Sequence, residues 1–308
     1  MKSIYSVAWS PNGHWIACSG DEDRVEVWDW RLETVVQSLP AKKKGVRSLS
    51  WSPDSRLLAC GQGFWQEHDR GHVQVWKVAG GEVWAAREPF YGAYSVSFDA
   101  SGEWLVSGHG SGMVNIWHAE SGEKYRSIAV GYDITRLING VCFSPDSKKI
   151  AFGSCYEDKL YIYDFDGNNR QEFNHPRSWS WRNFEHSIRF SPNNDWLARG
   201  SQNGYVRLWS TRNPTSSLDL AGHQLATIAI AWSPEGGFLA SGSRDGQIKV
   251  WDITRQNELC CMTHRPIHSI CYSPDGHFLA SAGDDHSIRI WDVDPNSVRF
   301  GQCLKILK

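Results

Sequence analysis

The sequence lacks the features of a membrane or secreted protein. No stretch reaches the roughly 18 apolar residues that a bilayer-spanning helix needs. The first residues, MKSIYSVAWSPNG, contain one lysine and no apolar run of signal-peptide length. The net charge is −2 over 308 residues, which gives no general attraction to nucleic acid or anionic membranes. We therefore expect a soluble, cytoplasmic protein that makes no membrane contact.

Cysteine pairs with metal-binding spacing are also lacking. The eight cysteines are scattered through apolar, strand-like stretches, and none belongs to a Cys-x-x-Cys motif suited to zinc. We expect reduced, buried thiols in a cytosolic setting, and we expect neither a metal nor a cofactor.

What the sequence does contain is a repeat. FLASGSRDGQIKVWD (238–252) and FLASAGDDHSIRIWD (278–292) are identical at eight of fifteen positions. Six Ser-Pro pairs recur along the chain, and FDASGEW (98–104) stands where a seventh is due. The closing aromatics of the repeats lie 40 to 48 residues apart, which suits units of four short strands. These aromatics are Trp28, Trp76, Trp117, Tyr163, Trp209, Trp251 and Trp291.

Each unit is expected to form one four-stranded antiparallel sheet. The first three segments of a unit are apolar or alternating, and turn residues separate them. No amphipathic helix of useful length lies between the strands. Units of this size are stable when they pack radially around a central channel. The sequence therefore predicts an all-β, seven-bladed propeller as one domain, with blades near 1–40, 41–88, 89–130, 131–175, 176–220, 221–262 and 263–308.

The units resemble the WD-repeat (WD40-type) β-propeller family from residue 4 to the last residue of the sequence. The resemblance implies a hydrogen-bonded chain of His, Ser, Asp and Trp in each complete blade. Two units carry all four residue types, as His223, Ser241, Asp245 and Trp251 and as His264, Ser281, Asp285 and Trp291. The Asp is replaced by Ser111 in unit three and by Asn203 in unit five. Seven blades are therefore expected, without seven complete networks.

A catalytic interpretation of these residues is the weaker alternative. A Ser-His-Asp trio suits a hydrolase only if the serine faces a cleft, whereas Ser241 lies within a repeated strand. The acidic clusters at 20–24, 156–158 and 283–286 fall in turns where an Asp is already required. We therefore expect a protein that is not an enzyme, with an enzyme active at the channel mouth as the less favoured possibility.

The order of the segments also predicts how the ring closes. The chain starts on an innermost strand near Ile4 and ends on an outermost strand near Leu307, so every blade is expected to be built from contiguous sequence. The first and last blades should then meet only through side-chain packing.

Positions that vary between the units are the candidates for binding, because the residues that the units share are already used to hold the fold together. Inserted or enlarged loops carry aromatic residues and arginine, which are common at interface hot spots, and the run at 42–44 adds three lysines. The residue four before the end of each first strand also varies, and the resemblance places it at the channel mouth. The predicted partner-binding residues on that face, the top face, are Tyr5, Arg47, Phe64, Trp65, Phe90, Tyr91, Tyr94, Asn139, Trp179, Trp181, Arg182, Phe184, His186 and His268.

The resulting hypothesis is a non-catalytic interaction scaffold, adaptor or ligand-sensing propeller that binds a protein or peptide on its top face. Single-stranded nucleic acid is the alternative ligand. Phosphates could be contacted by Lys42 to Lys44, Arg47, Arg177 and Arg182, while Trp179 and Trp181 stack on bases. No continuous basic stripe supports that alternative, so nucleic acid is the less favoured partner. The sequence leaves open whether the protein is a monomer or a subunit of a larger complex.

Overall fold

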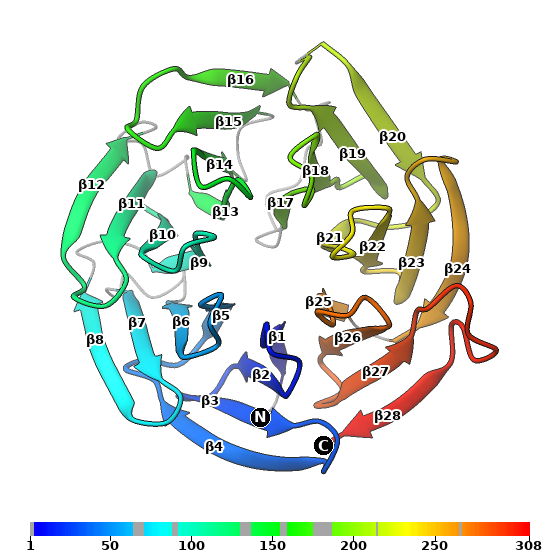
Figure 1. Cartoon of the computed structure of the whole chain (residues 1–308), viewed down its shortest axis with the longest axis horizontal. Helices are drawn as coiled ribbons and strands as arrows, with labels where there is room; N and C mark the ends of the chain where they lie inside the picture. The colour runs from blue at the N-terminus through cyan, green and yellow to red at the C-terminus, as the bar shows by residue number, and fades with distance from the viewer. Residues whose placement is uncertain are drawn as a thin grey trace.

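The computed structural model describes residues 3–63, 71–87, 92–129, 137–154, 159–174, 187–213, 215–264 and 267–308. Within these ranges every regular element is a β-strand, and the strands form seven four-stranded antiparallel sheets. The sheets are the blades of a ring, with β1, β5, β9, β13, β17, β21 and β25 innermost (Figure 1). The predicted all-β, seven-bladed propeller is therefore confirmed. Among the described residues, no helix has the length and apolar composition needed to cross a membrane.

The strands of each blade follow one another directly in the sequence. Blades 1 to 3 contain β1 (Ile4–Trp9), β2 (Trp15–Gly20), β3 (Arg24–Asp29) and β4 (Thr34–Pro40); β5 (Val46–Trp51), β6 (Leu57–Gln62), β7 (His72–Lys77) and β8 (Gly81–Arg87); and β9 (Ala93–Phe98), β10 (Trp104–His109), β11 (Met113–His118) and β12 (Lys124–Ala129). Blades 4 and 5 contain β13 (Ile138–Phe143), β14 (Lys149–Ser154), β15 (Lys159–Asp164) and β16 (Gln171–Asn174); and β17 (Ile188–Phe190), β18 (Trp196–Gly200), β19 (Tyr205–Ser210) and β20 (Ser217–Ala221). Blades 6 and 7 contain β21 (Thr227–Trp232), β22 (Phe238–Ser243), β23 (Gln247–Asp252) and β24 (Asn257–Thr263); and β25 (Ile267–Tyr272), β26 (Phe278–Gly283), β27 (Ile288–Asp292) and β28 (Cys303–Leu307).

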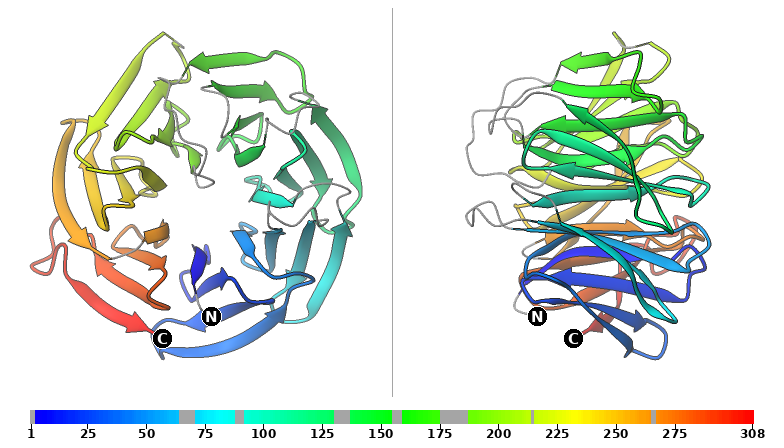
Figure 2. Two further views of the ribbon diagram at one scale, coloured as in Figure 1. Left: turned by 180° about the vertical axis from the view of Figure 1, so that it is seen from behind. Right: turned by 90° about the vertical axis from the view of Figure 1, so that its left-hand side faces the viewer.

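The antiparallel order gives the ring two different faces. The strands run from one face to the other (Figure 2). The turns between first and second strands, which contain the Ser-Pro pairs, lie on the face that we call the bottom. The turns between second and third strands, such as the one at Asp245, lie on the top face. The innermost strands therefore begin at the top and end at the bottom.

The Ser-Pro turns share one hydrogen bond that explains the serine. Its hydroxyl accepts a hydrogen bond from the backbone N–H five residues later, at 2.9 Å from Trp15 to Ser10 and 2.8 Å from Leu57 to Ser52. In blade 3, the Asp99 carboxylate accepts the same bond at 2.9 Å. An oxygen acceptor is thus what the turn needs, and FDASGEW supplies it without a serine.

Buried side chains between neighbouring sheets form the core. Each hydrophobic cluster joins two blades; one of them packs Val27 of β3 with Leu49 of β5 and Trp76 of β7. Trp76 is fully buried. Burial of large aromatic and branched side chains at each junction stabilises the ring.

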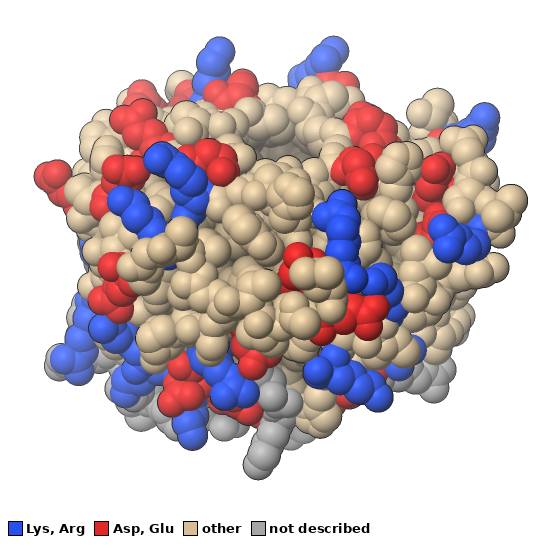
Figure 3. All heavy atoms as spheres, turned by 60° about the horizontal axis from the view of Figure 1, so that its bottom comes forward, with Lys and Arg blue, Asp and Glu red and all other residues tan. Residues whose placement is uncertain are grey.

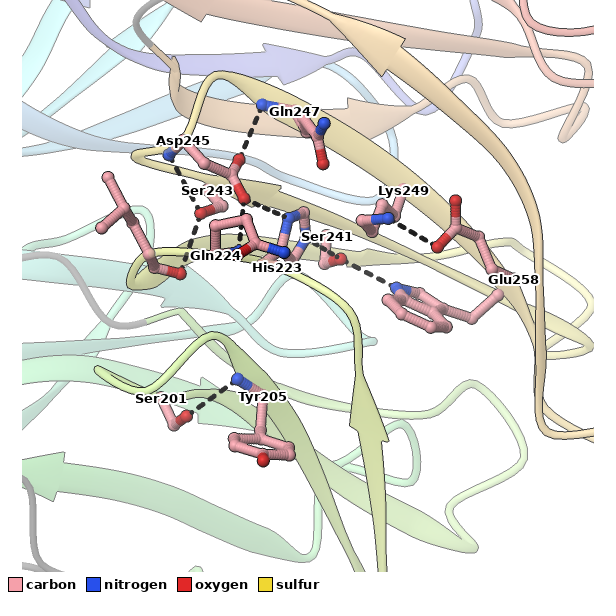
Figure 4. Close-up of polar contacts among 12 residues, drawn as sticks. Ser201, Tyr205, His223, Gln224, Ser241, Ser243, Asp245, Gln247, Lys249 and Glu258 are labelled. Atoms are coloured by element: carbon pink, nitrogen blue, oxygen red, sulfur yellow. Dashed lines mark hydrogen bonds and ion pairs between the residues drawn. The ribbon is translucent and has the colours of Figure 1, made fainter.

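Blade 6 contains the complete polar network (Figure 4). The Trp251 indole N–H donates to the Ser241 hydroxyl at 2.8 Å, and Ser241 lies 2.7 Å from Nε2 of His223. Nδ1 of His223 lies 3.3 Å from the Asp245 carboxylate. A neutral His223 with its proton on Nδ1 satisfies every partner in this chain. Burial lowers the pKa of His223, even though Asp245 opposes the shift, and so favours the neutral form.

Blade 7 uses the same four residue types with the histidine ring reversed. Nδ1 of His264 lies 2.6 Å from the Ser281 hydroxyl, while Nε2 lies 3.0 Å from the Asp285 carboxylate. The Trp291 indole N–H donates to Ser281 at 2.8 Å. The two blades thus satisfy the same buried groups with opposite histidine tautomers.

Blade 3 contains a network that the sequence analysis missed. His109 belongs to the same strand as Ser107, and its Nε2 lies 2.7 Å from the Ser107 hydroxyl. That hydroxyl accepts the Trp117 indole N–H at 2.7 Å. The available signal was the alternation Ser107-x-His109, which places both side chains on one face of β10. Burial, with a smaller contribution from the Lys124 charge, lowers the pKa of His109 to about 3.

The ring closes between blades 7 and 1, and every sheet is contiguous in sequence as predicted. Blade 1 and blade 7 side chains share a buried cluster that includes Val7 and Ile288. The expectation that these blades meet only through side-chain packing is wrong. The Val7 N–H donates to the Ser269 hydroxyl at 3.1 Å, and Nζ of Lys305 contacts Glu33 at 2.8 Å. The two chain ends lie close together at this junction (Figure 1).

Candidate functional site

A central channel with a volume of about 510 Å³ runs between the innermost strands. Residues of all seven blades line it, as the radial arrangement requires. Trp9, Trp51 and Trp232 lie toward its bottom end, because they close their innermost strands. This volume is within the range of small-ligand pockets, roughly 300 to 1,000 Å³.

Five predicted binding residues meet around the top half of this channel. They come from five different blades and are Tyr5, Arg47, Tyr94, Asn139 and His268. Tyr94 and Asn139 are each only 6% exposed, so they form the channel wall rather than a protruding surface. Tyr5, Arg47 and His268 are half-buried and reach further toward the solvent.

Tyr5, Arg47, His268 and Asp284 form a continuous line across blades 2, 1 and 7, which we call the mouth ledge. The Arg47 guanidinium lies over the Tyr5 ring at 4.5 Å. Tyr5 meets His268 edge to face, with ring centroids 5.6 Å apart. Nε2 of His268 lies 2.7 Å from the Asp284 carboxylate. These contacts hold a cation, an aromatic ring and an imidazole in fixed positions at the mouth.

The electrostatics of the mouth ledge depend on Asp284. Its pKa is lowered: partial burial raises it, but the hydrogen bond and charge of His268 outweigh that effect. The carboxylate is therefore ionised at neutral pH. The basic side chains that line the described channel are Arg47, Arg189 and His268, and no Asp or Glu accompanies them there.

Asn139 has two buried side-chain atoms without a partner among the described residues, whereas Trp9 and Tyr272 of the same channel each have one. Both its amide oxygen and its amide nitrogen are buried, and neither has a hydrogen-bond partner among the residues that the structure describes. Leaving such groups unsatisfied costs about 1 to 3 kcal/mol, and buried polar groups are nearly always paired. Because Asn139 lines the channel, a turn of its side chain toward the lumen would bring the amide within reach of a ligand at the mouth.

A ring of serines lies just below the mouth, and the sequence analysis missed it. Each serine stands three residues before the end of an innermost strand and bonds to the next blade around the ring. The Leu49 N–H donates to Ser6 at 3.2 Å, and the Val96 N–H donates to Ser48 at 3.1 Å. The available signal was this fixed spacing, at Ser6, Ser48, Ser95, Ser187 and Ser269.

The other predicted binding residues lie outside the described residues. They are Phe64, Trp65, Phe90, Tyr91, Trp179, Trp181, Arg182, Phe184 and His186.

The lysine run at 42–44 is partly held by the fold. The Lys42 N–H donates to the side-chain oxygen of buried Gln74 at 3.1 Å, and the Lys43 N–H donates to that of buried Gln62 at 2.8 Å. Nζ of Lys42 pairs with Glu82 at 2.9 Å. On the side that carries β4 and β28, acidic and basic side chains are interspersed (Figure 3).

The geometry does not suit the hydrolase alternative. Ser241 is fully buried, and its hydroxyl is already engaged by Trp251 and His223. A substrate carbonyl therefore has no access to it. In the described part of the chain, no group of three or more His, Cys, Asp or Glu side chains is arranged to hold a metal ion.

The prediction of buried thiols holds only in part. All seven described cysteines are free, and Cys18, Cys60 and Cys142 are buried. Cys261 and Cys303 are exposed instead, because they lie on the outermost strands β24 and β28, where alternate side chains point to solvent.

The sheets, their order and the repeated network define the class of protein, a β-propeller built from sequence repeats. The family profile described as "WD domain, G-beta repeat" matches residues 2–29, 33–77, 90–118, 185–210, 213–252 and 257–292. The chain belongs to this family. The sheet β13–β16 falls between matched segments, and it has Phe152 where the complete blades have serine.

Curated relatives support the family membership. The chain is 27% identical over 242 residues to the WD repeat-containing protein WDS homolog of Arabidopsis thaliana, covering 75% of this chain and 43% of that protein. It is 34% identical over 84 residues to the small ribosomal subunit protein RACK1y of Oryza sativa subsp. japonica, covering 25% and 23%. It is 22% identical over 213 residues to the serine-threonine kinase receptor-associated protein of Gallus gallus, covering 68% and 55%. The chain thus spans between about a quarter and about half of these relatives.

Proposed function

We propose that this propeller is a non-catalytic scaffold that binds an extended segment of a partner protein across the top mouth of its channel. The observation that carries the proposal is the Asn139 amide, buried and without a partner while it lines the channel. A peptide group of the bound segment would both accept from and donate to this amide, because it carries one N–H and one carbonyl.

The mouth ledge supplies the other half of the site. Arg47, Tyr5 and His268 are already held by one another, so little side-chain entropy is lost when a partner covers them. Tyrosine and arginine are also the residue types that most often dominate interface energies. Two relatives carry names that place them with other macromolecules, one as a ribosomal-subunit protein and one as receptor-associated. These names agree with a scaffold role for this chain.

The aromatic residues predicted in the loops, led by Trp65 and Trp181, extend the same proposal as further anchors. We also propose that the protein acts in the cytoplasm, where free thiols such as those of Cys261 and Cys303 stay reduced.

Affinity purification with mass spectrometry tests the proposal. The wild type, an Asn139→Leu variant, a Tyr5→Ala/Arg47→Ala variant and a Trp65→Ala/Trp181→Ala variant are compared as bait. A rim variant, Tyr125→Ala, serves as control because Tyr125 is exposed on the outermost strand β12. We expect the mouth variants to lose the proteins that the wild type and the rim variant capture. Equal capture by all folded baits would contradict the proposed face, and recovery of nucleic acid that salt releases would favour the alternative ligand.

A further inference from the structure

One charged side chain inside the channel is explained neither by the fold nor by the proposed docking. Arg189 is the last residue but one of β17, paired with Ala198 in the register of blade 5. The same register position in the other six blades carries only small side chains. They are Ala8, Ser50, Ser97, Cys142, Ala231 and Cys271.

The Arg189 guanidinium lies in the lumen and has no acidic partner within the described part of the chain. The residue lines the channel and is exposed to it. Its side-chain hydrogen bond runs from a terminal nitrogen to the Ile188 carbonyl at 2.9 Å. No described carboxylate forms an ion pair with it, whereas most other arginines in the described ranges have one, such as Arg207 with Asp219.

The position of Arg189 separates it from the mouth ledge. It stands two residues before Ser191, which opens a bottom turn, so it occupies the lower half of the channel. Its charge extends across the lumen: it opposes the burial that raises the pKa of Cys142 to about 11 and that of Cys271 to about 12. These two cysteines come from blades 4 and 7, so Arg189 acts on walls on both sides of its own blade.

The side chain is not needed to hold β17 in place. The contact of this residue with blade 6 is made by its backbone carbonyl, which accepts the Trp232 indole N–H at 3.3 Å. That bond is independent of the side chain. The other six blades have small residues at the equivalent position, so the innermost strand forms without a long basic side chain there.

We propose that Arg189 makes the lower half of the channel a binding site for an oxyanion, the carboxylate or phosphate group of a ligand that enters from the bottom face. A guanidinium binds such a group through two parallel hydrogen bonds, and the fixed fork of donors matches both anions. The absence of any acidic side chain from the described lining removes the competing partner. The hydroxyl group of Ser50, which also lines the channel, adds a neutral donor.

The test observes the arginine directly in the whole chain. Side-chain Nε–Hε resonances are recorded by NMR while inorganic phosphate is titrated at constant ionic strength. The Arg189 signal is assigned by its loss in Arg189→Ala, which should melt like the wild type because six blades carry a small residue there. Arg244, on a top turn, is the matched control arginine. We expect a saturable shift of the Arg189 signal, and affinity at least about tenfold weaker in Arg189→Ala, because a bidentate charged contact is lost.

A second titration with a short acidic peptide that contains carboxylates and no phosphate distinguishes the two sources of oxyanion. Saturation by both ligands supports a general oxyanion site, and saturation by one alone supports the site and names its ligand. A shift of Arg189 that only follows the non-saturating shift of Arg244 would overturn the proposal. Saturable binding that persists unchanged in Arg189→Ala would also overturn it and would move the anion to the mouth ledge. Neither result affects the Asn139 docking test, because that test measures the binding of a partner protein at the opposite end of the channel.

Discussion

One position on the second strand carries very different side chains in different blades. It is polar and hydrogen-bonded in blades 6 and 7, and it is filled by a large aromatic or a long basic side chain in blades 4 and 5. In blades 6 and 7 the second strand carries Ser241 or Ser281, each bonded to a tryptophan and a histidine. In blade 4 the equivalent residue is Phe152, which stacks on Tyr163 at 5.3 Å. In blade 5 it is Arg199, which is 5% exposed and donates to the Ser154 carbonyl of blade 4 at 3.2 Å.

This difference teaches that the fold requires the space between the sheets to be filled, and that it does not require one particular network. An aromatic stack fills it with apolar area, and a buried arginine fills it with one long side chain that satisfies a backbone carbonyl. Blades 6 and 7 instead tie their top turns to the preceding loop by hydrogen bonds. The consequences of substitution should therefore differ from blade to blade.

The largest difference is expected from Asp245→Ala in blade 6. The carboxylate accepts the Gln224 N–H and the Gln247 N–H, both at 2.8 Å, and holds His223. Its removal leaves the buried His223 N–H and the half-buried Gln247 N–H without their acceptor, and should lower the free energy of unfolding by about 1 to 3 kcal/mol. Urea unfolding measures this change.

The matched controls are Asn203→Ala in blade 5 and Ser111→Ala in blade 3. Asn203 is exposed, so its substitution should change the free energy of unfolding by less than about 0.5 kcal/mol. Equal losses for Asp245→Ala and the two controls would show that the complete network contributes nothing beyond the filled space.

The acid sensitivity of the histidine blades gives the next prediction. The folded pKa of His109 is about 3, below the ordinary value of 6.5. The unfolded chain therefore takes up the proton first, and the stability from neutral His109 is present above pH 6.5 and is lost as the pH falls toward 3. This histidine should lower the free energy of unfolding by about 2 kcal/mol between pH 8 and pH 5.

A His109→Gln variant isolates this contribution. Its unfolding free energy should fall less steeply than that of the wild type over the same pH interval, because a glutamine side chain does not titrate. Parallel pH profiles for the two proteins would rule out a buried neutral His109.

The smallest difference is expected between the closing junction and an ordinary one. Ser269→Ala removes the bond to the Val7 N–H of blade 1, and Ser48→Ala removes the bond to the Val96 N–H of blade 3. Each should cost about 1 kcal/mol, and the two costs should agree within about 0.5 kcal/mol. A much larger loss for Ser269→Ala in thermal or urea unfolding would identify the closure as a weak point of the ring.

The repeat made the fold predictable, because its landmarks are local. Ser-Pro turns and closing aromatics lie within one unit, and their spacing indicates four strands and seven blades. The complete networks were predictable for the same reason, since Ser241, Asp245 and Trp251 lie within eleven residues of one another in the sequence.

Contacts between blades were harder to predict, because they join residues about forty or more positions apart. The Ser6 to Leu49 bond spans 43 residues and the Ser269 to Val7 bond spans 262. For the candidate site, the sequence placed Tyr5, Arg47, Tyr94, Asn139 and His268 at one mouth. It did not show that Tyr94 and Asn139 would be buried, or that Asp284 would hold His268, because these facts depend on how neighbouring sheets pack.

The central claim is that the Asn139 amide serves a ligand rather than the fold, and one measurement tests it directly. With a partner identified by affinity purification, the Kd and the melting temperature are measured for the wild type and for Asn139→Leu. The account predicts a Kd at least about tenfold higher for the variant. This corresponds to about 1.4 kcal/mol of binding free energy, which is lost when the peptide group of the partner no longer has the Asn139 amide to hydrogen-bond with. Its melting temperature should be equal or higher, because two unsatisfied buried atoms are removed. An unchanged Kd, or a melting temperature well below that of the wild type, would contradict the claim.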